Sequence, residues 1–511
     1  MKTSYSKRSV SKFIISTLAI FVSIACLTAC QQRAIEFTPA SPPSVPTFDD
    51  KGDFPDLNPD WSLIDLKNTK LATLEFGLKD GFKSNPTVHV SPQTNSHNWR
   101  IKLVGINRTE AIKNADVLVR AFSRHSKYLL NEFQSVCRES LSLSATYHSI
   151  GIEINCPELK QSDISLLSGF WNKQAIEHID IDSVRRGLKL NDKLASVTGN
   201  NINSVFQKGL LSKHHPYLKV IGNKRSYDYL SKQQAIDLQQ KTAEQLEWHL
   251  MIEAPKQLSS QEFLELSQVA SSQLPQSKVK GESVTQEVKK LTQSKTIYLL
   301  DAPDSVDIRV RIGLNFNKEI VNAKKLTNSE VQLSDQKSRF ACSTLSALLG
   351  RGSFGRLFYD LRSTRGLTYG AYAHCREQPL LRALVLYGSA SIEHSGAFTE
   401  GMLAHFDLIK NTTAEKAEID SLKLSLLGNT LIADEQQDNF NTQQLLEPNF
   451  EENKRQRMMW LKALSSEQVK KMANVYLQRS PVVVIRADAD AVMQDLKDKL
   501  PEWNFVVIED Y

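Results

Sequence analysis

The sequence lacks an apolar run long enough to cross a membrane comfortably. Its best candidate, residues 13–27, is interrupted by Ser16, Thr17 and Ser23, whereas a spanning helix takes about 20 apolar residues. The chain also contains 11 histidines, and no two of them lie four positions apart. This absence excludes the motifs His-x-x-Glu-His and His-Glu-x-x-His, in which two zinc ligands share one face of a helix.

The N-terminus has the pattern of a secretory signal. Four basic residues precede the apolar run, namely Lys2, Lys7, Arg8 and Lys12, and Leu27-Thr28-Ala29-Cys30 follows it. That tetrapeptide resembles the bacterial lipoprotein cleavage box, which implies cleavage before Cys30 and lipidation of its thiol. In lipoproteins of this kind, the residue after the lipidated cysteine indicates the membrane, and a glutamine there, as Gln31 is here, implies the outer membrane. The expected product is a lipid-anchored protein that faces the periplasm.

Positive charge is scarce once the signal is removed. The formal net charge falls from +6 to +2, because the signal carries four basic residues and no acid. The basic pI of 8.8 therefore comes largely from the signal. Nucleic-acid binding has no electrostatic support in the mature chain.

Composition divides the chain into five parts. Residues 1–29 are the signal peptide, and residues 30–58 form a proline-rich tether behind the lipidated cysteine. Residues 271–295 are rich in Ser, Gln and Lys and are predicted to be a linker. It separates two domains, 59–270 and 296–511, within about 450 residues that are ample for two or three domains.

The two domains show a similar order of elements. Apolar residues alternate with polar ones at 87–90, 99–103 and 150–156, and a helical pattern covers 111–130. The apolar stretch 246–252 closes the first domain as a strand. Strands are expected in the second domain at 297–300, 306–314, 383–387, 482–485 and 505–508, with helices between them. The fold class is therefore α+β, with two sheets that are each packed with helices.

Four cysteines remain after Cys26 leaves with the signal and Cys30 carries lipid. They are Cys137, Cys156, Cys342 and Cys375. An oxidising compartment permits a disulfide within each half, and four buried free thiols are equally compatible with the sequence. None of these cysteines has the close spacing of a zinc site.

One segment of the second half carries a specific motif. Residues 349–370 read LGRGSFGRLFYDLRSTRGLTYG, with a glycine-rich turn, a short helix that ends in Leu-Arg, and Gly-Leu-x-Tyr entering a strand. This pattern resembles the second-domain signature of the pitrilysin/insulinase (M16-like) zinc metallopeptidases. In that family an Arg and a Tyr at this spacing reach the substrate near the scissile peptide, which implies the same for Arg362 and Tyr369. The alternative is a solvated Arg362 and a Tyr369 packed in the sheet.

The first half resembles the same family over its length. Leu78-Lys79-Asp80-Gly81, the His215-Pro216-Tyr217 turn and the closing strand 246–252 match family features. The resemblance covers roughly residues 70–511 and implies two homologous domains that form half of a clamshell. His215 is a metal ligand by type, but a histidine before proline in a loop is more often structural.

The zinc motif of the active family members is missing. Their helix should fall within residues 113–125, where Asp116, Val119 and Arg120 stand in place of His, Glu and His. Elsewhere His374 and Glu377 make His-x-x-Glu without a second histidine, which we interpret as coincidence. The chain is expected to bind no catalytic zinc and to hydrolyse no peptide by itself.

These features favour a non-catalytic subunit of a peptidase pair. The resemblance implies a homologous partner that carries the zinc, an unfolded peptide or polypeptide as substrate, and this chain supplying Arg362 and Tyr369. A second hypothesis is an envelope binding or scaffold protein with no role in proteolysis. A third, unassisted peptidase activity, requires an unrelated site.

Overall fold

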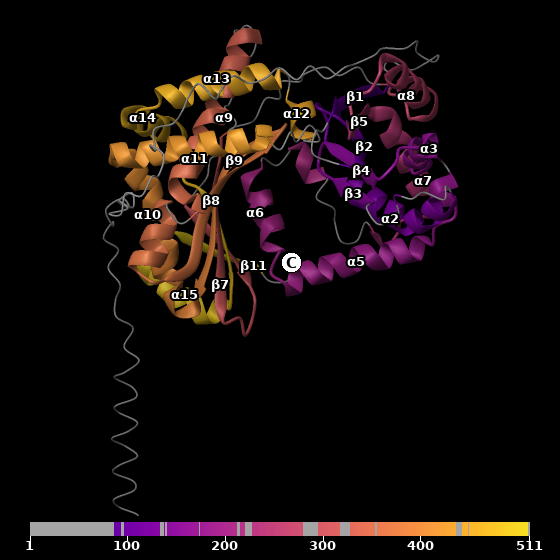
Figure 1. Ribbon diagram of the computed structural model, residues 1–511. Coiled ribbons are helices and arrows are strands. Elements are labelled where there is room, and N and C mark those ends of the chain that lie inside the picture. Colours follow the sequence, from indigo (N-terminus) through magenta and orange to yellow (C-terminus); the bar gives the residue numbers. More distant parts are fainter. Residues whose placement is uncertain are drawn as a thin grey trace, which may run out of the picture.

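The computed structural model contains two β-sheets, each covered by helices on its outer face (Figure 1). It describes residues 86–92, 97–132, 137, 141–172, 174–211, 215–219, 227–278, 295–316, 328–352, 355–435, 442–447 and 449–508. The predicted signal, Cys30, the tether and the match at residues 78–81 lie outside the described residues. This arrangement confirms the expected α+β class with two sheets.

The first sheet has five strands in the order β1-β5-β2-β4-β3. They are β1 (Thr87–Pro92), β2 (Trp99–Ile106), β3 (Ser142–Ala145), β4 (Ser149–Cys156) and β5 (Glu247–Ala254). Strand β1 runs parallel to β5, and the other neighbours are antiparallel. The sequence predicted all of these strands except β3.

Most helices of the first part cover one face of this sheet. The helical elements are α2 (Ala115–Glu132), α3 (Gln161–Gly169), α4 (Gln174–Glu177), α5 (Ile181–Val197), α6 (Ile202–Leu210), η3 (Pro216–Lys219), α7 (Lys232–Gln245) and α8 (Ser260–Gln273). Helix α8 was not foreseen, although Ser259 and Glu262 form a capping box at its start. It extends three residues into the predicted linker.

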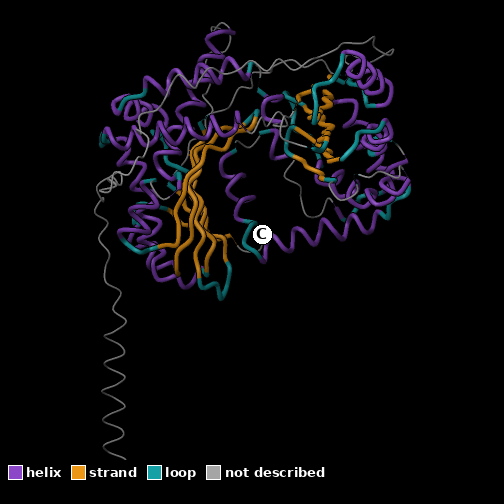
Figure 2. Tube along the Cα trace, in the orientation of Figure 1, coloured by secondary structure: helices purple, strands orange, loops and turns teal. Residues whose placement is uncertain are grey.

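The second sheet has six strands in the order β11-β6-β10-β7-β9-β8. They are β6 (Thr296–Asp301), β7 (Asp307–Asn315), β8 (Thr368–Gln378), β9 (Leu381–Ser391), β10 (Val482–Ala487) and β11 (Asn504–Ile508). Strands β11, β6 and β10 are mutually parallel, and the remaining pairs are antiparallel. Figure 2 shows the two sheets as separate groups of strands.

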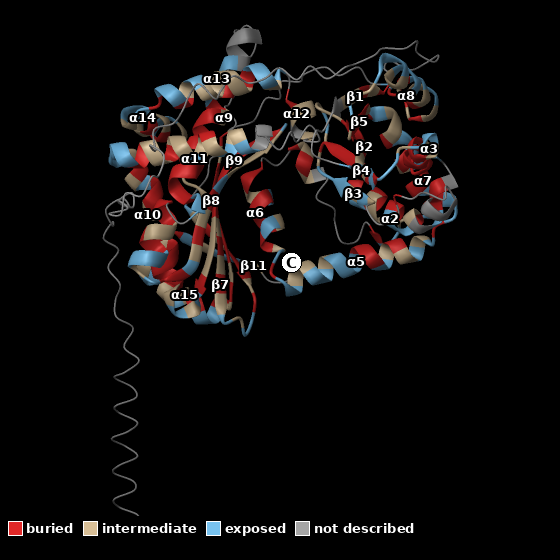
Figure 3. Ribbon diagram, viewed as in Figure 1, coloured by how far each residue is buried: buried red, intermediate tan, exposed pale blue. Residues whose placement is uncertain are grey.

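Most helices of the second part cover the outer face of this sheet. They are α9 (Asn328–Gly350), η7 (Phe358–Thr364), η8 (Ile392–His394), α10 (Ser395–Asn411), α11 (Lys416–Glu435), α12 (Thr442–Leu446), α13 (Phe450–Ala463), α14 (Ser466–Tyr476) and α15 (Ala489–Lys499). Buried residues concentrate on the strands and on the helix faces turned toward them (Figure 3). No helix within the described ranges combines the length and apolar character that a membrane crossing requires.

Helix α6 belongs to the first part of the chain but packs on the inner face of the second sheet. Its buried side chains form one apolar cluster with residues of β9 and β10. The close approach requires glycine at two positions. A Cβ on Gly209 would lie 2.6 Å from Val482 Cγ1, and one on Gly313 would lie 2.5 Å from the Phe206 ring. The two sheets are thus connected by packing as well as by the chain.

Helix α12 makes the reverse contact. It comes from the second part of the chain, and its Leu445 and Leu446 pack on Val104, Ile106 and Met251 of the first sheet. Side chains alternate between the faces of a strand, so this is the face opposite the main core of the first sheet. Helix α6 of the first part packs on the second sheet, and α12 of the second part packs on the first sheet, so both helices hold the two halves together. The exact domain boundaries stay predictions.

Each half contains one disulfide. Cys137 is bonded to Cys156, and Cys342 is bonded to Cys375. The Cα atoms of the pairs are 4.7 and 5.5 Å apart, within the normal range for disulfides. The sequence left open a disulfide within each half or four buried free thiols, and the structure has the two disulfides.

Candidate functional site

Arg362 lies on η7, a single stretch of π-helix between α9 and β8. Such stretches often occur at functional sites. Its side chain is exposed, and its guanidinium carbon is 4.7 Å from the centroid of the Phe358 ring. The cation is therefore oriented by an aromatic face and keeps its donors available to solvent.

Two buried ion pairs fix η7 in place. Just before it, Arg356 donates two hydrogen bonds to Glu418 of α11, at 2.5 and 2.8 Å. Within it, the buried Asp360 accepts hydrogen bonds from Arg365 Nε at 2.8 Å and from His405 Nε2 of α10 at 3.1 Å. These contacts attach the backbone around Arg362 to two helices of the core.

Tyr369 is displaced from the sheet by a β-bulge. Thr368 is paired with Ala390 and Gly370 with Ser389, so no residue of β9 stands opposite Tyr369. The Thr368 hydroxyl stabilises the bulge, because it donates to the Ser389 carbonyl and accepts from the Gly370 N–H. Bulges of this kind redirect side chains, and the Tyr369 side chain is 91% exposed.

Arg362 and Tyr369 are therefore both directed into solvent from a rigid support. In the described part of the chain, neither side chain has a hydrogen-bond partner. Of the alternative interpretation, the solvated Arg362 holds, whereas Tyr369 does not pack within the sheet. The arrangement offers a planar set of N–H donors and a phenol, which are suited to binding peptide carbonyls and a developing oxyanion.

The helix expected to carry zinc ligands is α2, and its candidate positions are engaged in packing. Asp116 accepts a hydrogen bond from the buried Tyr227 hydroxyl. Arg120 donates to the Gly187 carbonyl of α5 at 3.2 Å, and Val119 packs against the core. A Cβ on Gly187 would lie 3.0 Å from Arg120 Nε, so the glycine makes room for the guanidinium. The positive charge of Arg120 would repel a metal ion at this position.

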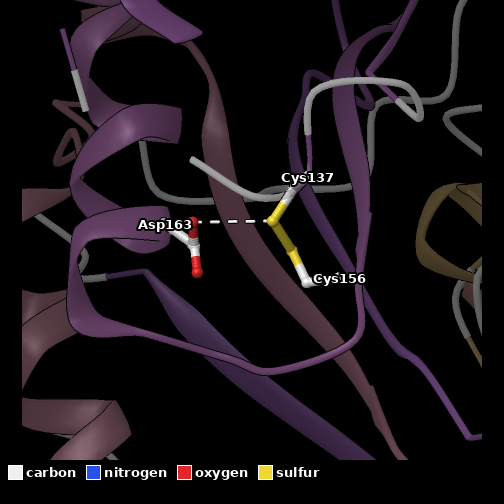
Figure 4. A group of neighbouring side chains, drawn as sticks. All are labelled: Cys137, Cys156 and Asp163. Carbon is white, nitrogen blue, oxygen red and sulfur yellow. Dashed lines mark hydrogen bonds between the residues drawn. A yellow bond between two sulfur atoms is a disulfide. The ribbon is translucent and has the colours of Figure 1, made fainter. Parts of the chain in front are cut away.

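One group of potential metal ligands occurs among the described residues. Cys137, Cys156 and Asp163 lie together and are buried (Figure 4). The two sulfur atoms form a disulfide, however, and a metal ligand must be a thiolate. Cys137 Sγ lies 3.5 Å from Asp163 Oδ1. These residues do not fit a metal site while the disulfide is intact.

His374 and Glu377 do not form a site. Both lie on β8 three residues apart, so their side chains point to opposite faces of the sheet. His374 packs edge-on against Tyr387, whereas Glu377 pairs with Arg339. The interpretation of this pair as coincidence agrees with the geometry.

His215 has a structural role at the junction of the two halves. Its Nδ1 accepts from the Tyr217 N–H, and its Nε2 therefore donates to the Leu380 carbonyl at 3.0 Å. The Tyr217 hydroxyl accepts from the Leu380 N–H at 3.1 Å and donates to His148 Nε2 at 2.7 Å. His148 in turn donates from Nδ1 to the Asn107 carbonyl. Burial lowers the pKa of His148 to about 4, so this chain of hydrogen bonds contains a neutral imidazole.

Sequence reasoning did not identify the groups that support the site. Glu418, Asp360 and His405 have no spacing that marks them, because their partners are up to 62 residues away. Asp360 lies inside the recognised motif, which was its one available signal. Cys30 lies outside the described residues, and its lipidation stays a prediction.

Comparisons with known proteins concern the fold of the chain. Residues 245–426 match the family described as "Peptidase M16 inactive domain". No curated protein matches the chain. Three solved structures illustrate its structural similarity.

The first is the peptidase M16 inactive domain from Pseudomonas fluorescens, with a TM-score of 0.60 and 13% identity, covering 82% of this chain and 98% of that one. A protease from Helicobacter pylori gives a TM-score of 0.61 and 14% identity, with 82% and 99% covered. The periplasmic protease PqqL from Escherichia coli gives a TM-score of 0.59 and 13% identity, with 87% of this chain and 51% of that chain covered. These likenesses show the M16-like fold and confirm the resemblance seen in the sequence.

Proposed function

We propose that this inactive M16-like peptidase homologue is the substrate-binding subunit of a zinc metallopeptidase complex in the cell envelope. The proposal rests on one observation, which is that the surrounding structure holds Arg362 and Tyr369 in place. Both side chains extend into solvent from a segment that is anchored by buried ion pairs, while α2 has Arg120 where a zinc ligand would stand. Binding groups are retained and the metal site is lost, which suits a division of labour between subunits.

The partner in this proposal is a homologous subunit that carries zinc and the general base. The chain covers 51% of PqqL, so that protease contains about as much again beyond the matched half. A two-subunit assembly would bring together the same amount of structure. An unfolded polypeptide would bind between the halves, with Arg362 donating to its carbonyls and Tyr369 near the scissile bond.

The test is reconstitution. The mature chain is mixed with a homologue from the same genome that contains His-x-x-Glu-His, and hydrolysis of an unfolded fluorogenic polypeptide is measured. We expect the two chains to co-elute in size-exclusion chromatography and to be active only together. Failure to associate, or full activity of the zinc homologue alone, would contradict the proposal.

The alternative is a scaffold protein that keeps the fold without taking part in proteolysis. The exposure of Tyr369 argues against it, because a scaffold has no need for a bulge that extrudes a tyrosine. The absence of any zinc-motif homologue in the same genome would favour the scaffold.

The envelope location forms part of the proposal and rests on Cys30 and the preceding residues. We expect a Cys30→Ser variant to lose incorporation of labelled fatty acid and to keep its signal peptide, because the cleavage box ends in this cysteine. Labelling that persists in this variant would contradict lipidation at Cys30. The partner's zinc can be checked separately by metal analysis of each purified subunit.

A further inference from the structure

A cavity of about 400 Å³ lies in the second half, where α9, β8 and the start of α13 meet. Its lining includes Ser343 of α9, Cys375 of β8 and Phe450 of α13. Small-molecule sites have volumes of about 300 to 1,000 Å³. At about 30 Å³ for each water molecule, this cavity has room for about a dozen. Neither Arg362 nor Tyr369 lines it, so it is separate from the candidate site.

Two contacts hold the walls of the cavity together. The disulfide between Cys342 and Cys375 joins α9 to β8. On the third wall, Arg457 of α13 donates a hydrogen bond to Gln336 of α9 at 3.0 Å. A ligand would therefore meet a preorganised cavity and would lose little free energy in ordering it.

Four charged side chains line the cavity, two of each sign. Arg457 Nη1 donates to Glu447 Oε1 at 2.7 Å, and Arg339 Nη1 lies 3.4 Å from Glu447 Oε2. Arg339 also pairs with Glu377. None of the four side chains is more than 24% exposed. The charged lining is therefore neutral as a whole, and it presents both signs of charge to a ligand.

Part of the hydrogen-bonding capacity of the lining is unused. Arg339 Nε is buried and has no partner among the described residues. The Ser343 hydroxyl makes no hydrogen bond to any described residue either. Burial alone would lower the pKa of Arg339, but attraction to Glu377 and Glu447 outweighs burial and raises it, so the guanidinium stays a cation. A buried donor without an acceptor needs an explanation, and an acceptor on a bound molecule would supply one.

The mixture of charges selects the class of ligand. Glu377 and Glu447 would repel a simple anion, and Arg339 and Arg457 would repel a simple cation. A purely apolar molecule would displace water from four charged groups without replacing its hydrogen bonds. A zwitterion offers a carboxylate to the arginines and an ammonium group to the glutamates. The Phe450 ring adds an apolar surface for a side chain.

We propose that this cavity binds a zwitterion of the size of an amino acid or a dipeptide, with an apolar side chain against Phe450. The bound molecule would also stabilise the joint between the two halves. Glu447 directly follows Leu445 and Leu446 of α12, which pack on the first sheet (Figure 1). The inference does not depend on the proposed function, because the cavity contains no residue of the candidate site.

The experiment measures binding to the full mature chain by isothermal titration calorimetry. Three probes share one side chain: L-leucine carries both charges, N-acetyl-L-leucine only the carboxylate, and L-leucinamide only the ammonium group. We expect saturable binding of L-leucine and at least about tenfold weaker binding of the other two. A leucyl-leucine dipeptide forms a fourth arm, and its affinity relative to L-leucine tells which size of zwitterion the cavity prefers. Hydrogen exchange should slow within residues 442–447 and 449–457 when the ligand is bound.

Variants locate the binding. Arg457→Gln should weaken the binding of L-leucine by about tenfold or more. Arg455→Gln, at a more exposed position on the same helix, should leave it unchanged. Because Arg457→Gln removes one partner of the buried Glu447, its thermal unfolding is measured as well. Ser343→Leu fills the cavity without removing a charge and should abolish binding while the thermal unfolding stays cooperative.

Several results would overturn the inference. Lack of saturable binding of both L-leucine and the dipeptide up to about 10 mM would show that the charges form a structural ion-pair network around water. Equal affinities of the three leucine derivatives would show that the two charges are not read together. Unchanged binding in a folded Ser343→Leu variant, or exchange protection confined to other segments, would place the ligand elsewhere.

Discussion

His405 Nε2 donates a hydrogen bond to Asp360 Oδ2 at 3.1 Å, and both side chains are buried. His405 lies on α10, whereas Asp360 lies on the π-helix that carries Arg362. The same carboxylate also accepts from Arg365. A single buried acid therefore connects the segment of the candidate site to the helical layer behind the sheet.

Asp360→Asn should destabilise the protein and disturb the site together. The substitution removes the buried negative charge that pairs with Arg365 and accepts from His405, which should cost about 3 kcal/mol. Chemical denaturation measures this loss of unfolding free energy. Asp420→Asn removes an exposed ion pair with Lys416 and should change it by less than about 0.5 kcal/mol. Equal effects of the two substitutions would show that Asp360 is not an anchor.

Arg362→Ala and Tyr369→Phe should affect activity without affecting stability. Both side chains are exposed, so the unfolding free energy should change by less than about 0.5 kcal/mol. In the reconstituted complex, loss of a donor to the developing oxyanion should lower kcat by about 100-fold. Arg186→Ala and Tyr229→Phe are matched controls at other exposed positions and should leave kcat unchanged. Unchanged kcat in the Arg362 and Tyr369 variants would remove their assigned roles.

The hydrogen-bond chain through His148 should make stability depend on pH. Burial lowers the pKa of His148 from 6.5 to about 4, so the unfolded state takes up a proton before the folded state does. Its contribution to stability is complete above pH 6.5 and is lost as the pH falls toward 4. Between these values the slope should approach about 1.4 kcal/mol per pH unit.

His148→Gln tests that contribution, because Gln does not titrate. Its overall stability can change for other reasons, but the slope of unfolding free energy against pH between 6.5 and 4 should fall by close to the value for one proton. The Tyr217 hydroxyl should keep its acceptor in this variant through the amide oxygen. If the variant keeps the full slope, His148 is not a source of the pH dependence.

The strands could be predicted from the sequence because burial on one face leaves a local pattern. Residues 306–314 alternate in polarity, and β7 was found at Asp307–Asn315. The motif likewise placed Arg362 before a strand that begins near Tyr369. The bulge at Tyr369 could not be predicted, because it depends on a hydrogen bond from Thr368 to Ser389 across two strands.

The position of α6 was beyond sequence analysis for a related reason. The amphipathic pattern of Ile202–Leu210 predicts that the helix buries one face, and it does not say against which sheet. The answer depends on Val482, which lies in the other half of the chain. Contacts between residues so far apart leave no periodic signal in either segment.

The two disulfides should be found by mass spectrometry of unreduced peptides as Cys137–Cys156 and Cys342–Cys375. Each closes a loop, with sequence separations of 19 and 33 residues. Loop closure on this scale stabilises a protein by roughly 3 to 4 kcal/mol in the chain-entropy account. Reduction should lower the unfolding free energy accordingly, and detection of four free thiols in protein isolated under oxidising conditions would contradict the assignment.

The packing of α6 on the second sheet can be tested at Gly209. In an isolated helix, Gly→Ala stabilises by about 1 kcal/mol, and Gly428 of α11 has nothing within 4 Å of its Cβ position. Gly428→Ala should therefore be neutral or stabilising. At Gly209 the new methyl group would meet Val482 Cγ1 at 2.6 Å. Val482 is buried and β-branched, so the overlap should cost about 1 to 3 kcal/mol and reverse the sign of the substitution.

A double-mutant cycle identifies the cause of that reversal. Val482→Ala alone should destabilise by leaving a cavity, and the methyl group of Gly209→Ala should partly fill that cavity in the double variant. The two substitutions should therefore couple favourably by at least about 1 kcal/mol in urea denaturation. Additive effects would mean that α6 does not rest on β10. Since α6 comes from the first half and β10 from the second, the coupling energy measures directly the contact that joins the two halves.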